Sequence, residues 1–111
     1  MSQIYQYIDN VGLRENTTLA TSTAQKVFAS VSGYTPPTHR QGVNLVNQNA
    51  TATLYVKFVP YPASTPSFST TDFDIAIPAL GDRQIQVGPG VAIYVWQNSG
   101  STSNYAALEL I

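Results

Sequence analysis

The strongest constraint on the fold is a period of two in the hydrophobic residues. Between positions 53 and 58, the apolar side chains of Leu54, Val56 and Phe58 alternate with those of their neighbours along the chain. Such an alternation is typical of a strand with one face in a core and the other toward solvent. The segment therefore predicts a half-buried β-strand.

Further segments share this strand-like composition, being rich in β-branched or aromatic residues and bounded by Gly, Pro, Asn, Asp or Ser. The predicted strands are 26–31, 43–47, 53–58, 74–77, 83–87, 91–97 and 104–111, with a weaker one at 3–8. About eight short strands leave little room for a helix. The sequence therefore predicts an all-β, antiparallel sandwich.

The segments between these strands differ in length. The short breaks at 47–49, 81–82 and 88–90 are typical of tight turns, so we expect consecutive strands to pair as hairpins. The longer breaks at 32–42 and 60–71 could carry the chain from one sheet to the other or present residues to a ligand.

The 111 residues fit a single domain spanning 1–111, and the 1–25 region could include an extended N-terminal arm. Within it, the segment 14–25 alternates poorly, which leaves an irregular strand or an arm as the alternatives. The chain has 0 Cys, so it has no disulfides and its stability must come from apolar burial or a partner subunit.

Charged residues make up only 10% of the chain, and the formal net charge is −1. A polar surface built mainly of amides and hydroxyls loses its water more cheaply than an ionic one, which suits a protein that binds a surface. The five basic residues form no cluster, so we expect no nucleic-acid partner. No segment approaches the length of a membrane span and no secretory signal precedes the first strand, so we expect no membrane association and synthesis in a host cytoplasm.

The sequence offers little material for catalysis. His39 is the only histidine, and no nucleophile-elbow motif accompanies it. Asp72 and Asp74 could in principle serve a glycosidase or bind calcium, but a solvated strand face explains them better. The glycines beside Pro89 lack the lysine and helix of a phosphate-binding loop. We therefore expect no enzyme, no cofactor and no metal site.

Two groups of aromatic residues are candidates for binding. Tyr94 and Trp96 share one face of the predicted strand 91–97, and such rings on a sandwich can stack on sugars, although packing is the commoner use of strand aromatics.

The predicted partner-binding residues are aromatic or loop positions that look exposed. They are Tyr5, Tyr7, Tyr34 and Arg40. The segment 4–8 could be an edge strand or an arm that adds to a neighbour's sheet.

Several segments resemble those of a known class of proteins. They are 43–58, 79–81, 87–96 and 106–110. Together they resemble small structural proteins of tailed bacteriophages, and most of all the capsid-stapling decoration proteins of epsilon15-like podoviruses. The resemblance implies a jelly-roll-like sandwich, often dimeric, on the outer capsid surface of the virion, where it bridges subunits of the major capsid protein.

Two functional hypotheses follow from the sequence. The leading one is a non-enzymatic virion structural protein that binds the major capsid protein, acts as a homodimer and stabilises the shell. A carbohydrate-binding module, free-standing or displayed on a virion, is the alternative, with Tyr94 and Trp96 as its platform.

Overall fold

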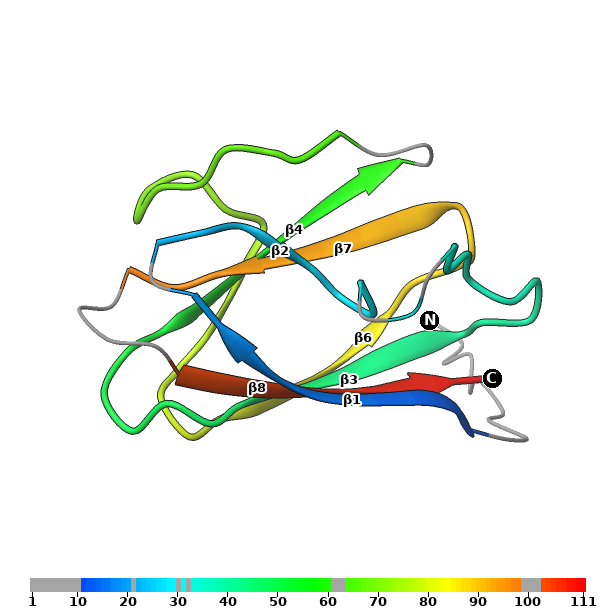
Figure 1. The fold of residues 1–111 in the computed structure, drawn as a ribbon, viewed down its shortest axis with the longest axis horizontal. Helices are drawn as coiled ribbons and strands as arrows, with labels where there is room; N and C mark the ends of the chain where they lie inside the picture. The colour runs from blue at the N-terminus through cyan, green and yellow to red at the C-terminus, as the bar shows by residue number, and fades with distance from the viewer. Residues whose placement is uncertain (1–10, 21, 30, 32, 61–63, 99–102) are drawn as a thin grey trace, which may run out of the picture.

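The protein is a β-sandwich of two four-stranded antiparallel sheets, seen in a computed structural model that describes residues 11–20, 22–29, 31, 33–60, 64–98 and 103–111 (Figure 1). One sheet has the strand order β1-β8-β3-β6 and the other the order β2-β7-β4-β5. The strands are β1 (Val11–Leu19), β2 (Gln25–Lys26), β3 (Gly42–Asn47), β4 (Leu54–Pro60), β5 (Ile75–Ile77), β6 (Asp82–Gln86), β7 (Val91–Trp96) and β8 (Ser103–Leu110).

This strand order is that of a jelly roll, as expected. Consecutive strands lie in opposite sheets, except for β4 and β5, which pair within one sheet. The expectation that short turns join hairpins is therefore wrong at 47–49, 81–82 and 88–90, where the chain crosses between sheets. A hairpin and a crossing turn both keep the apolar side of each strand toward the core, so the period of two does not distinguish them.

Most predicted strands are confirmed to within two residues at each end. In the predicted strand 26–31, β2 ends at Lys26. Val27 still donates its N–H to Ile93 O at 2.9 Å, and the buried Val27 and Phe28 lie in an irregular turn with Phe28 at a φ of 66°. The uncertain segment 14–25 contributes most of β1, which pairs with β8 along its length and so belongs to the sandwich. The weaker strand at 3–8 lies outside the described residues.

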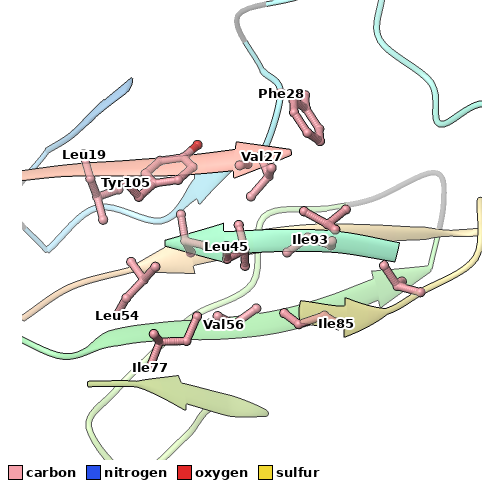
Figure 2. Close-up of a cluster of buried hydrophobic side chains, with 14 residues drawn as sticks. Leu19, Val27, Phe28, Leu45, Leu54, Val56, Ile77, Ile85, Ile93 and Tyr105 are labelled. Carbon is pink, nitrogen blue, oxygen red and sulfur yellow. The ribbon is translucent and has the colours of Figure 1, made fainter. Parts of the chain in front are cut away.

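The core lies between the two sheets, and both contribute to it (Figure 2). Val43 and Leu45 of β3 face Leu54 and Val56 of β4, and all four are fully buried. The predicted inward positions of β4 are thus confirmed, with Phe58 half-buried against the same cluster. In the described part of the chain, no helix is long and apolar enough to cross a membrane.

A buried amide ties the turns at one end of the sandwich together. Asn47, the last residue of β3, is fully buried, and its Nδ2 donates to the carbonyl oxygens of Ala52, Ile77 and Pro78 at 2.8–3.1 Å. Its Oδ1 accepts from the backbone N–H of Asn49 at 3.0 Å and from Nε2 of Gln97 at 2.9 Å. One side chain therefore links the turns that follow β3, β5 and β7.

Replacing Asn47 with alanine should strongly destabilise the protein. The change removes all five hydrogen bonds of the buried Asn47 side chain, and we expect a loss of about 3–5 kcal/mol in the free energy of unfolding. Chemical denaturation followed by circular dichroism measures this. Asn44→Ala, on the outward side of the same strand, is the control and should cost less than about 1 kcal/mol. Equal losses for both variants would contradict the role given to Asn47.

Candidate functional site

The outer face of the β2-β7-β4-β5 sheet is covered by the chain's own β4–β5 connection, which runs back along β4 (Figure 1). The Phe68 ring stacks on Trp96 with ring centroids 5.9 Å apart and an interplanar angle of 7°. Tyr55 packs against both Trp96, at 5.6 Å, and Phe73, at 4.9 Å. This aromatic layer covers part of the face, because offset and tilted ring pairs stabilise the connection over the sheet, and Phe73 remains exposed at its outside.

One lysine fastens the same connection to the sheet. Lys57 Nζ lies 3.0 Å from Asp72 Oδ1, donates to the carbonyl oxygen of Ser67 at 2.5 Å and lies 5.5 Å from the centroid of the Phe68 ring. Asp74 Oδ2 instead accepts the backbone N–H of Phe58 at 2.8 Å. Asp72 and Asp74 therefore have separate structural contacts.

The proposed sugar platform is not an open pair of rings. Tyr94 is only 5% exposed. One face of the half-buried Trp96 is occupied by Phe68. A sugar stacking on this strand would have to displace the Phe68 ring or approach from the opposite face of the indole.

The predicted partner-binding residues are placed very differently from one another. Tyr5 and Tyr7 lie outside the described residues. Tyr34 is half-buried, with its ring 5.2 Å from that of Phe28. The expected exposure of Arg40 is wrong, because Arg40 is 4% exposed and its guanidinium donates to the carbonyl oxygens of Gly88 and Val91, each at 2.5 Å. Arg40 thus holds the β6–β7 turn against the β2–β3 connection.

Two buried glutamates, which the sequence analysis did not single out, face the interior from β1 and β8. Glu15 Oε1 accepts the Tyr105 hydroxyl at 2.7 Å and the backbone N–H of Phe28 at 2.8 Å. Glu109 accepts the Tyr34 hydroxyl and, at 3.3 Å, the backbone N–H of Leu13. The sequence indicates the burial of Glu109, because this residue falls on the inward side of the predicted strand 104–111 together with Tyr105 and Ala107.

These contacts change the acidity of both phenols. Burial, then the hydrogen bond to Glu15 and its negative charge, raises the pKa of Tyr105 above its ordinary value. Burial and Glu109 likewise raise the pKa of Tyr34, and the nearby Arg40 acts in the opposite direction without cancelling the effect. The glutamates are therefore structural acceptors that fix the β2–β3 connection on the sandwich.

Little else in the described residues is arranged for chemistry. His39 is exposed in the β2–β3 connection. Among the residues that the structure describes, no three His, Cys, Asp or Glu side chains gather into a group that could hold a metal ion.

The outer face of the β1-β8-β3-β6 sheet forms an open groove of about 440 Å³. The groove lies over β1, β8 and β3, and the strand register places two rows of residues across the whole face. The first row runs Arg14, Leu108, Asn44 and Gln84, and the second runs Asn16, Ala106, Val46 and Asp82. Apolar side chains at the centre are thus framed by amides and by one charge of each sign. This arrangement of an apolar centre and a polar rim is typical of protein-binding surfaces.

Neither the known protein families nor the curated proteins include a match to this chain.

The phenols of Tyr34 and Tyr105 should make the protein less stable at alkaline pH. An unfolded chain releases the tyrosine protons near the ordinary pKa of 10.0, whereas the folded protein retains them, so stability is complete below pH 10 and falls as the pH rises further. Each tyrosine that ionises only on unfolding contributes a slope of up to about 1.4 kcal/mol per pH unit. Denaturant titrations at pH 9, 10 and 11 measure the slope, and Tyr105→Phe should reduce it. An unchanged slope in that variant would show that Tyr105 is not responsible.

Proposed function

We propose that this chain is a non-enzymatic structural protein of a tailed-phage virion, which binds the outside of the capsid and bridges subunits of the major capsid protein. The observation that carries the proposal is the difference between the two outer faces. The protein partly covers one face with its own Phe68 and Phe73, whereas the other face is an open groove with an apolar centre.

The chemistry of the open face suits contact with another protein. Leu108, Ala106 and Val46 supply apolar area that gains from burial, and Asn16 and Asn44 can exchange water for hydrogen bonds to a partner. Arg14 and Asp82 lie at opposite edges and can fix the orientation of the partner. A surface of this kind binds without requiring the removal of many charges from water.

Stapling a shell does not need a strong individual interface. A protein that binds the assembled shell but not separated subunits stabilises the shell by mass action. A molecule that bridges two subunits must present two contacts, and a symmetric homodimer presents the same open face twice. Repetition over many copies multiplies the effect of each modest contact.

Co-sedimentation with phage heads that lack the protein tests this function. We expect the wild-type protein to pellet with the heads at a fixed stoichiometry and to raise the temperature at which they release DNA. Ala106→Arg places a charge at the centre of the groove and should weaken binding at least tenfold, or by about 1.4 kcal/mol. Thr65→Arg adds the same charge to the exposed β4–β5 connection and should bind like the wild type.

The outcomes test separately whether the protein binds capsids and whether the groove is the contact surface. If the wild-type protein binds and both variants bind equally well, the groove is not the contact surface. If the wild-type protein stays in the supernatant, capsid binding is wrong. Titration with glycans, followed by Trp96 fluorescence, would then test the carbohydrate-binding alternative.

A further inference from the structure

The most exposed large hydrophobic side chain among the described residues belongs to Leu80, at 68%. It lies in the turn between β5 and β6, and its backbone has a φ of 58°. That left-handed conformation is costly for a bulky L-residue, and the corresponding turn position usually holds glycine or asparagine. Leu80 therefore destabilises the folded protein in two ways, through its left-handed backbone and through its exposed apolar side chain.

The turn that carries Leu80 is held rigidly by hydrogen bonds. Its own N–H donates to the carbonyl oxygen of Asn49 at 3.0 Å, and the Gly81 N–H donates to that of Pro78 at 2.9 Å. Asn47 binds the turn from beneath, donating its backbone N–H to Gly81 O at 2.8 Å and its Nδ2 to Pro78 O at 3.1 Å. The buried amide network thus maintains the left-handed backbone and directs the leucine outward.

We propose that Leu80 is an anchor that inserts into an apolar pocket of the capsid subunit bound by the open face, an inference that rests on the proposed function. Backbone strain that a surrounding network maintains is often found where function uses it. Only Gly81 separates Leu80 from β6, and β6 contributes Asp82 to the second row of the open face. The turn that carries the anchor therefore adjoins the edge strand of the open face.

The surroundings of Leu80 favour a protein pocket over a lipid surface. The turns 48–53, 78–81 and 97–98, called the tip here, contain no Asp, Glu, Lys or Arg. A loop that inserts into a membrane typically combines its apolar residues with basic ones that attract anionic lipids. An uncharged tip with one projecting leucine instead fits a neutral, apolar pocket.

Leu80→Asn should separate stability from binding. Asparagine tolerates the left-handed conformation, so we expect the melting temperature to rise by roughly 4 °C, while the affinity for phage heads falls roughly 10- to 100-fold because the apolar anchor is gone. Leu80→Met keeps both the strain and an apolar side chain and should change neither quantity much. Co-sedimentation and thermal unfolding measure the two effects on the same preparations.

Val31→Asn is the control for loss of exposed apolar surface, because Val31 is 40% exposed in the β2–β3 connection, at the opposite end of the sandwich. It should bind heads like the wild type.

If Leu80→Asn also binds heads with wild-type affinity, the role of Leu80 as an anchor is wrong while the proposed function stands. A wild-type protein that does not bind heads overturns both. Binding to phosphatidylcholine vesicles that Leu80→Asn abolishes would overturn the protein pocket in favour of a membrane.

Discussion

The amide of Asn47 is the interaction on which the turns at one end of the sandwich depend. A jelly roll sends nearly every connection across from one sheet to the other, so the backbone groups in these turns have no partner strand. Asn47 binds the turns after β3 and β5 directly and the turn after β7 through Gln97. A single buried side chain thus stabilises the crossings that define the fold and the exposed shape of the tip.

At the opposite end of the sandwich, charged side chains bind the backbone and side-chain groups of the connections. Arg40 donates to carbonyl oxygens on both sides of the β6–β7 turn, and Glu109 holds Tyr34 of the β2–β3 connection. Such buried groups lose their hydration, so they stabilise the fold only where good acceptors and donors replace the water. Their burial also removes them from the surface, which leaves the outer faces poorer still in charge.

The sequence was sufficient to locate most strands and the fold class, because alternating burial is a local property. It could not assign neighbouring strands to sheets, since a crossing turn buries the same residues as a hairpin. The first strand was obscured because Glu15 occupies an inward position where an apolar residue is expected. The burial of Arg40 depends on acceptors 48 and 51 residues away, and the cover of Trp96 on a ring from a distant connection. Local patterns do not encode such contacts.

The low charge of the chain follows from this division of the surface. One outer face is partly covered by aromatic rings, and the other, together with the tip, is largely apolar or amide-bearing. A partner meeting this surface would displace water from groups that release it cheaply. It would also meet a surface that is already ordered, because strand pairing fixes the face and hydrogen bonds to Asn47 and Asn49 fix Leu80. Such preorganisation reduces the entropy lost on binding, so a small contact area can suffice.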